Sequence, residues 1–196
     1  MKKILITGCA GFIGFHLANK LKKNFEIDGI DNMNDYYDKN LKINRLNLIS
    51  EFINFQEIDI SNFAELSDLF SKNSYDCVIH LAAQAGVRYS FQNPQSYINS
   101  NILGTFNLLN SFKLHWESKK NSKNFLFLQI STDEVFGSLG LDDLPFNEKT
   151  AYDPRSPYAA SKASSDHLCK AWFNTYGLPI IVSNCSNNYG PYHYPE

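Results

Sequence analysis

The 196-residue chain has few cysteines, no clustered metal-binding side chains and no long hydrophobic run. Its cysteines lie too far apart for a CxxC redox motif or a zinc knuckle, so free thiols are expected. The five histidines are scattered and form no HExxH motif, so no bound metal is expected. No apolar run reaches the length of a membrane span, and the N-terminal one stops after three residues, too short for a secretory signal. We therefore expect a cytoplasmic protein.

The composition is that of an ordinary globular protein, with 43% hydrophobic and 19% charged residues. A formal net charge of −2 gives no reason to expect binding to nucleic acid or to an anionic membrane. The length suffices for one α/β domain with a real core. We treat residues 1–196 as a single domain. Because the chain stops soon after its last expected strand, we expect it to be cut before a further substrate-binding domain.

Hydrophobic periodicity predicts strands that alternate with helices. Strands are expected at residues 2–7, 26–30, 52–58, 76–81, 124–130 and 179–183. Helices are expected at 12–23, 39–48, 63–71, 95–116 and 157–176. Such alternation favours a parallel, doubly wound sheet with right-handed crossovers, the Rossmann arrangement.

A glycine-rich turn, Gly8-Cys9-Ala10-Gly11-Phe12-Ile13-Gly14, joins the first strand to the first helix. Glycines here permit the tight turn, the approach of a pyrophosphate and close packing of helix on strand. Asp31 ends the second expected strand, where a carboxylate can accept from both ribose hydroxyls and repel a 2′-phosphate. This context favours NAD as cofactor. The alternative is a strand-to-helix turn that binds nothing.

Tyr158 and Lys162 form a YxxxK pair, one helical turn apart on one face. A tyrosine is a weak base at neutral pH, but a nearby ammonium and a positive nicotinamide ring favour its phenolate. It can then take a proton from a substrate alcohol during hydride transfer. About 0.8 such patterns are expected by chance in this chain, so the argument depends on position. The pair opens the helix between strands five and six, at the ligand edge of the sheet.

Motifs along the whole chain resemble the extended short-chain dehydrogenase/reductase family, in particular its nucleotide-sugar epimerases and dehydratases. The matching stretches are TGCAGFIG at 7–14, LAAQ at 81–84, NPQSY and SNILGTFNLL at 93–109, STDEVFG at 131–137, SPYAASKASSD at 156–166 and NCSNNYGPYHYPE at 184–196. The resemblance implies that Thr132, Tyr158 and Lys162 form the redox centre. It implies an NAD site made by Gly8, Gly11, Phe12, Ile13, Gly14, Asp31, Asn32, Asp59, Ile60, Leu81, Ala82, Ala83, Asn101, Ser131, Tyr158 and Lys162. From the residues alone, Asp59-Ile60 can equally be the region before a helix N-cap.

The second half of the chain resembles dTDP-glucose 4,6-dehydratases, through Thr132-Asp133-Glu134. The resemblance implies that Glu134 is the base that removes the C5 proton and Asp133 the acid that expels the C6 hydroxyl. A plain C4 epimerase needs neither group. Adjacent carboxylates in different environments can divide these roles by pKa. The alternative is a polar loop in which Asp133 and Glu134 only cap turns.

The first half resembles UDP-glucuronate 4-epimerases, through DNMNDYYDKNLKINRL at 31–46 and AAQAGVRYSFQNP at 82–94. Arg88 is expected near the substrate in either case, although an exposed arginine can also be a solvated loop residue. The resemblance implies a nucleotide-sugar site made by Gln84, Arg88, Thr132, Asn187, His193 and Glu196.

Together these observations favour an NAD-dependent nucleotide-sugar 4,6-dehydratase. A UDP-sugar 4-epimerase is the alternative of the same class, and a non-catalytic NAD-binding module is the alternative of another class. The resemblance also implies a homodimer that packs the helices at about 95–116 and 157–176 against their copies in the partner.

Overall fold

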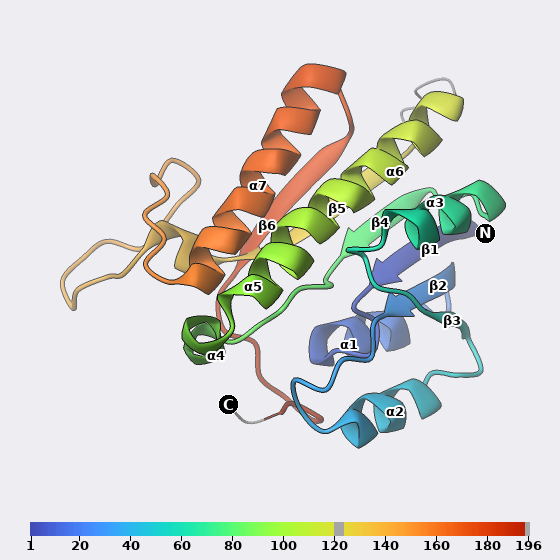
Figure 1. The fold of residues 1–196 in the computed structure, drawn as a ribbon, viewed down its shortest axis with the longest axis horizontal. Coiled ribbons are helices and arrows are strands. Elements are labelled where there is room, and N and C mark those ends of the chain that lie inside the picture. Colours follow the sequence, from blue (N-terminus) through green and yellow to red (C-terminus); the bar gives the residue numbers. More distant parts are fainter. Residues whose placement is uncertain (120–123, 195–196) are drawn as a thin grey trace.

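The computed structural model of the protein describes residues 1–119 and 124–194. Over these residues six strands form one parallel sheet in the order β3-β2-β1-β4-β5-β6 (Figure 1). The order confirms the expected doubly wound Rossmann arrangement, in which the chain reverses direction across the sheet after β3. The strands are β1 (Lys2–Thr7), β2 (Phe25–Asp31), β3 (Ile53–Glu57), β4 (Cys77–His80), β5 (Leu126–Thr132) and β6 (Ile180–Cys185).

The expected helices are present, and the structure adds detail that the sequence did not suggest. They are α1 (Phe12–Leu21), α2 (Lys39–Asn47), α3 (Phe63–Lys72), α6 (Gly104–Ser118) and α7 (Pro157–Tyr176). The helix expected at 95–116 starts as α5 (Pro94–Tyr97) and passes through a π-helical stretch, η1 (Ile98–Leu103), before α6. A short helix, α4 (Val87–Gln92), and a 3₁₀ turn, η2 (Asp133–Phe136), occur where loops were expected.

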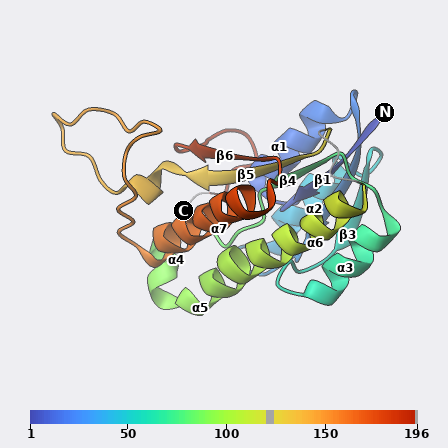
Figure 2. The same cartoon turned by 90° about the horizontal axis from the view of Figure 1, so that it is seen from above.

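Both faces of the sheet are covered by helices, because the strands are apolar on both sides. Ile4 and Ile6 of β1 belong to the core beneath α1 and α2. Leu5, between them, points to the opposite core, beneath α3, α6 and α7. Figure 2 shows the resulting three layers, with the sheet in the middle.

The ends of α7 are fixed by local chemistry. Ser156 Oγ accepts a hydrogen bond of 3.0 Å from the backbone N–H of Ala159, and Pro157 occupies the first helical position. Gly177 ends the helix with a φ of 72°, a left-handed conformation that glycine adopts without strain. These caps confirm the predicted start and end of the helix that carries Tyr158 and Lys162.

Over the described residues, no helix has the length and apolarity needed to cross a bilayer. Within that same part of the chain, no three His, Cys, Asp or Glu side chains come together as a group able to hold a metal ion. The four cysteines are free thiols (Cys9, Cys77, Cys169 and Cys185).

Candidate active site at the carboxyl edge of the sheet

The glycine-rich turn leaves the first amides of α1 open to a ligand. Gly8 has a φ of +71°, and a Cβ on Gly14 would lie 2.2 Å from the carbonyl oxygen of Gly8. The turn and its contact with the helix therefore require glycine, as predicted. Gly11 is the N-cap of α1, and no side chain caps the amides that follow it. Such a helix N-terminus binds a phosphate group well, so this turn fits a dinucleotide pyrophosphate.

A cleft of about 870 Å³ lies along the carboxyl edge of the sheet, from the glycine turn to the start of α7. It is lined by most of the predicted cofactor residues and by four of the five predicted catalytic residues. These lining residues are Gly8, Gly11, Phe12, Ile13, Gly14, Asp31, Asn32, Ile60, Leu81, Ala82, Ala83, Ser131, Thr132, Glu134, Tyr158 and Lys162. The fold thus brings residues from both halves of the chain to one site.

Asp31, at the end of β2, is buried and paired with a lysine that the sequence analysis did not single out. Lys42 Nζ lies 3.2 Å from Asp31 Oδ1, and both side chains are less than 10% exposed. The same oxygen accepts a hydrogen bond of 2.9 Å from the amide of Met33. The lysine partly neutralises the carboxylate, so repulsion of a 2′-phosphate by Asp31 is weaker than the sequence suggests.

Asp59 lies beside the cleft wall rather than on its surface. It accepts hydrogen bonds from the side chain of Asn32 at 3.0 Å and from the amide of Ser61 at 2.8 Å. Burial opposes ionisation of Asp59, but these hydrogen bonds outweigh it and lower its pKa. Asp59 therefore holds Asn32, which does line the cleft, and fixes the turn that leads to α3.

Lys162 is buried one turn after Tyr158 on α7. Its ammonium donates a hydrogen bond of 2.7 Å to the carbonyl of Ile130 in β5. Burial lowers the pKa of Lys162, and the nearby charge of Asp166 opposes that shift. Tyr158 is half-buried at the cleft surface, and its ring lies 6.1 Å from that of Tyr97. The pair thus places a buried lysine one helical turn from a tyrosine that lines the cleft.

Asn101 lies behind the cleft wall rather than on its surface, and its contact with the cofactor stays a prediction. Its side chain, only 1% exposed, accepts from the amide of Gln84 at 2.7 Å and donates to Ser161 Oγ at 2.8 Å. Asn101 belongs to the π-helical stretch η1. It therefore ties the loop after β4 to α7, and it is placed to position Gln84, which lines the cleft.

A buried chain of hydrogen bonds runs behind the same wall. Thr105 Oγ1 donates to the carbonyl of Asn101, so it accepts from His80 Nε2 at 3.0 Å. His80 Nδ1 then accepts from Thr7 Oγ1 at 2.8 Å, and the backbone amides of residues 81–82 donate to that same hydroxyl. Burial, and to a lesser extent the charge of Lys162, lowers the pKa of His80 to about 3. This Thr7–His80–Thr105 chain connects the end of β1 to α6 through a neutral imidazole.

The 3₁₀ turn after β5 separates the two predicted carboxylates. Thr132 Oγ1 accepts from the amide of Glu134 at 3.2 Å, so the threonine, and neither carboxylate, caps this turn. Glu134 lines the cleft together with Thr132, Tyr158 and Lys162. Asp133 does not line it, and its Oδ1 lies 3.4 Å from Thr132 Oγ1.

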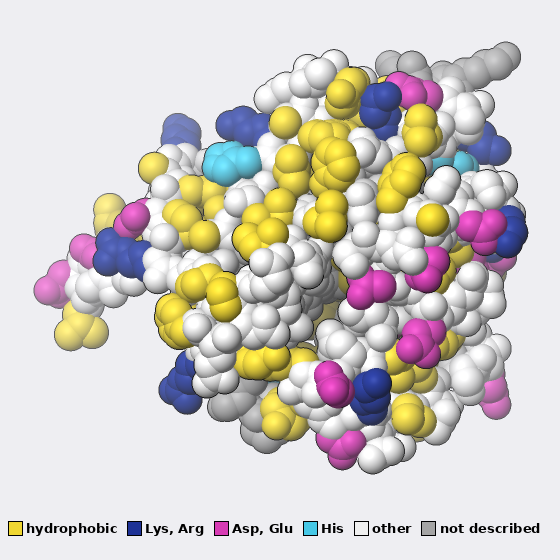
Figure 3. Space-filling model, viewed as in Figure 1, with side chains coloured by type: hydrophobic (Ala, Val, Ile, Leu, Met, Phe, Trp, Pro, Cys, Tyr) yellow, Lys and Arg dark blue, Asp and Glu magenta, His cyan; other side chains and the backbone are white. Residues whose placement is uncertain are grey.

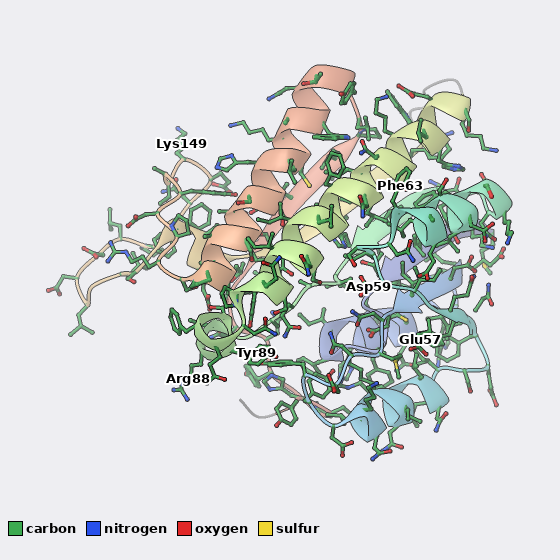
Figure 4. All side chains as sticks on the ribbon, in the orientation of Figure 1. Glu57, Asp59, Phe63, Arg88, Tyr89 and Lys149 are labelled. Atoms are coloured by element: carbon green, nitrogen blue, oxygen red, sulfur yellow. The ribbon has the colours of Figure 1, made fainter. Side chains whose placement is uncertain are left out.

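Most of the predicted substrate residues line the cleft, and one lies outside the described part of the chain. Gln84, Arg88, Asn187 and His193 all line it. Figure 4 shows Arg88 on α4, at the rim of the molecule, and the side chain is exposed. Glu196 lies outside the described residues.

Several residues that line the cleft were not predicted as site residues from the sequence, notably Tyr37, Lys42, Arg45 and Tyr194. The only signal was the spacing of Lys42 and Arg45, three residues apart and hence on one helix face. Because α2 is largely polar in sequence, the spacing of Lys42 and Arg45 did not indicate that these two cations are buried rather than solvated.

Known proteins resemble this chain over its whole length. A sequence model of the family described as GDP-mannose 4,6 dehydratase matches residues 5–196. A dTDP-glucose 4,6-dehydratase of Salmonella typhimurium is 49% identical over 99% of the chain, and one of Neisseria meningitidis serogroup B is 45% identical over 100%. The chain spans 56% of the length of each of these relatives.

Solved structures resemble the fold equally well in both branches foreseen from the sequence. DesIV, a dTDP-glucose 4,6-dehydratase from Streptomyces venezuelae crystallised with NAD, has a TM-score of 0.85 and 30% identity, covering 98% of this chain and 58% of that one. UDP-glucuronic acid 4-epimerase from Bacillus cereus, also with NAD, has a TM-score of 0.85 and 33% identity over the same shares. The chain therefore belongs to the GDP-mannose 4,6 dehydratase family, within the extended short-chain dehydrogenase/reductases.

Proposed function

We propose that the protein is an NAD-dependent nucleotide-sugar 4,6-dehydratase of the dTDP-glucose type. The observation that carries this proposal is Glu134, a carboxylate in the same cleft as Thr132, Tyr158 and Lys162. A C4 epimerase needs only the threonine, tyrosine and lysine. A dehydratase also needs a base for the C5 proton, and Glu134 is placed to supply it.

The cofactor site fits NAD. The uncapped amides of α1 would hold the pyrophosphate, and Asp31 with Lys42 would hold the adenosine ribose. When bound, the cofactor supplies an acceptor for the hydride of sugar C4 and a donor that returns it to C6. We propose residues 1–196 as the domain that carries this site, and a cytoplasmic location stays a prediction.

The chain's own residues perform the proton steps. Tyr158, assisted by Lys162 one helical turn away, removes the hydroxyl proton at C4, while Thr132 hydrogen-bonds the C4 oxygen. Glu134 removes the C5 proton, which the new ketone at C4 acidifies. Asp133 is proposed as the acid that protonates the leaving C6 hydroxyl. To act, its side chain must turn from Thr132 toward the cleft.

The test uses the full-length protein with dTDP-glucose. The expected product is the 4-keto-6-deoxy sugar, and Glu134→Gln should slow water loss by about 100-fold or more. Transfer of hydride to NAD should persist in this variant, because it does not involve the glutamate. Glu148→Gln, in the exposed loop before α7, is the matched control and should act like the wild type. Loss of water that does not depend on Glu134 contradicts the proposed role.

The second candidate is a UDP-sugar 4-epimerase, favoured by the AAQAGVRYS stretch and by the epimerase structure described above. It requires that UDP-glucuronate give UDP-galacturonate without loss of water. A non-catalytic module would bind NAD and transfer no hydride with either sugar.

We also propose a homodimer through the outer faces of α6 and α7. Figure 3 shows hydrophobic side chains gathered over these two helices. On these helices Leu114, Phe173 and Tyr176 are 56%, 52% and 45% exposed. Apolar surface on this scale favours association. Light scattering on the full-length protein should give a dimer, and Leu114→Glu with Phe173→Glu should give a monomer. A wild-type monomer contradicts this proposal.

A further inference from the structure

Arg45 joins three segments that are far apart in the sequence. Its side chain, on α2, is completely buried. Nη1 donates to the carbonyl of Ala10 at 3.0 Å and to Tyr37 Oη at 2.6 Å, and Nη2 donates to the carbonyl of Tyr192 at 2.6 Å. Ala10 belongs to the glycine turn and Tyr192 to the segment after β6. One guanidinium therefore ties the last described segment of the chain to the cofactor-binding turn.

The charge of Arg45 has no counter-ion in the described part of the chain. Each of its three acceptors is a neutral oxygen, and Nε has no hydrogen-bond partner among residues 1–119 and 124–194. Within those ranges no carboxylate lies within ion-pair distance of it. A buried cation is costly without a nearby negative charge. Arg45 lines the same cleft as the glycine turn, and within the described residues only its three neutral acceptors offset that cost.

Aromatic side chains of residues 191–194, the segment that Arg45 holds, also pack against rings elsewhere in the protein. Tyr194 stacks on Tyr37, with ring centres 5.0 Å apart and planes at 16°. The ring of His193 lies 4.8 Å from that of Phe12, on the first turn of α1. Packed aromatic pairs stabilise a contact beyond the effect of the area that they bury.

The backbone of this segment is strained, which means that its surroundings hold it in place. Tyr192 has a φ of 65°, a left-handed conformation that is unfavourable for a bulky side chain. Its ring packs edge-on against Phe15 at 5.4 Å, and its carbonyl accepts from Arg45. These contacts compensate for the strain and fix the path of residues 191–194 over α1.

We propose that Arg45 is a positioning residue that clasps segment 191–194 onto the glycine turn and so retains the dinucleotide in its cleft. The inference rests on the proposed cofactor site and goes beyond it, because no contact of Arg45 with substrate is required. The same segment carries His193, a predicted substrate residue. Arg45 thus links retention of the cofactor to placement of the sugar.

The experiment compares Arg45→Met with the wild type in the full-length protein. Two quantities are measured: the rate at which bound NAD is released, and the rate of chymotrypsin cleavage after Tyr192 in the NAD-free protein. We expect both to rise by about tenfold or more, the effect of losing hydrogen bonds to a buried charge. Far-UV circular dichroism checks that the sheet and helices remain.

Two surface variants keep the test decisive if Arg45→Met fails to fold. Tyr194→Ala removes the stack on Tyr37 but leaves the hydrogen bonds of Arg45 intact, and it should raise both rates by a smaller factor, about threefold. Tyr189→Ala is the matched control, because Tyr189 lies just before segment 191–194 and is 91% exposed, and it should change neither rate.

The cleavage and release rates together decide whether Arg45 holds the segment. Unchanged cleavage after Tyr192 in Arg45→Met and Tyr194→Ala overturns the clasp. Faster NAD release with unchanged cleavage also overturns it, since Arg45 would then act on the cofactor directly. A wild-type protein that binds no NAD contradicts the proposed function, and the cleavage rates alone then decide whether the clasp exists.

Discussion

At one end of the cleft the charged groups are buried and already bonded within the protein; at the other, Lys162 is buried in this way, and the side chains in front of it are half-buried at the cleft surface. Asp31, Lys42 and Arg45 are 7%, 5% and 0% exposed. Thr132, Glu134 and Tyr158 are only half-buried. The glycine-turn end is thus organised before any ligand arrives, which reduces the cost of binding. The β5–α7 end keeps its reactive groups accessible, as proton transfer to a changing substrate requires.

Replacement of Tyr158 by Phe should separate the two ends most clearly. Loss of the phenol should reduce turnover of the full-length protein by about 10²- to 10⁴-fold, the usual contribution of a general base. Binding of NAD should remain within about twofold, because the glycine-turn end does not depend on the hydroxyl. Steady-state kinetics and a cofactor titration measure these quantities. A comparable loss of NAD affinity would contradict the division of the cleft into two ends.

His80 tests how the two ends are held together. Its pKa falls from 6.5 to about 3 on folding, so the unfolded chain binds a proton that the folded protein excludes. The folded state is therefore favoured by the neutral His80 above pH 6.5, and this contribution to the free energy of unfolding is lost as the pH falls toward 3. We expect urea unfolding to show about 2 kcal/mol less stability from this residue at pH 5 than at pH 7.

The matched measurement is the same pair of unfolding curves for His80→Asn, which removes the titrating group. Its stability should fall less steeply between pH 7 and pH 5 than that of the wild type. Equal losses in both proteins would show that other groups set the acid sensitivity.

Asp31→Asn tests the glycine-turn end alone. The variant removes a ribose acceptor and leaves Lys42 without its carboxylate. We expect NAD to bind about tenfold more weakly, and NADP relatively better than before, because an unpaired cation attracts a 2′-phosphate. Titrations with both cofactors measure the ratio of affinities. Asp35→Asn, an exposed neighbour, is the control and should leave that ratio unchanged. An unchanged ratio in Asp31→Asn would mean that the Asp31–Lys42 pair does not select the cofactor.

Features of the cleft that depend on neighbouring residues could be predicted from the sequence. The glycine turn is a local motif, in which Gly8 and Gly14 meet within seven residues, so spacing alone identified it. Asp31 followed from its position at the end of the second expected strand. The strands themselves were evident because both faces of β1 are apolar, and the described sheet is parallel and doubly wound as expected.

The remaining features depend on contacts between distant segments. Arg45 meets Tyr192, 147 residues away, and no local pattern marks a buried cation on a polar helix. Asn101 turned inward because Gln84 and Ser161 use both ends of its amide. The helix α4 follows Gly86, whose φ of 94° turns the chain before Arg88, and this turn was not foreseen. The burial of Arg45, the inward orientation of Asn101 and the start of α4 are set by tertiary contacts and backbone turns that leave no local pattern in the sequence.

The smallest expected effect concerns the start of α7, which positions the β5–α7 end. Ser156→Ala removes the cap on the helix that carries Tyr158, and it should lower stability by about 1 kcal/mol. Asn62 caps α3 by the same chemistry, accepting from the amide of Ala64 at 3.1 Å, so Asn62→Ala should cost about the same. Only Ser156→Ala should also reduce turnover, because only that cap holds a residue of the reactive end. Equal turnover in the two variants, at equal stability, would show that the first turn of α7 is held by its packing on β5 rather than by its cap.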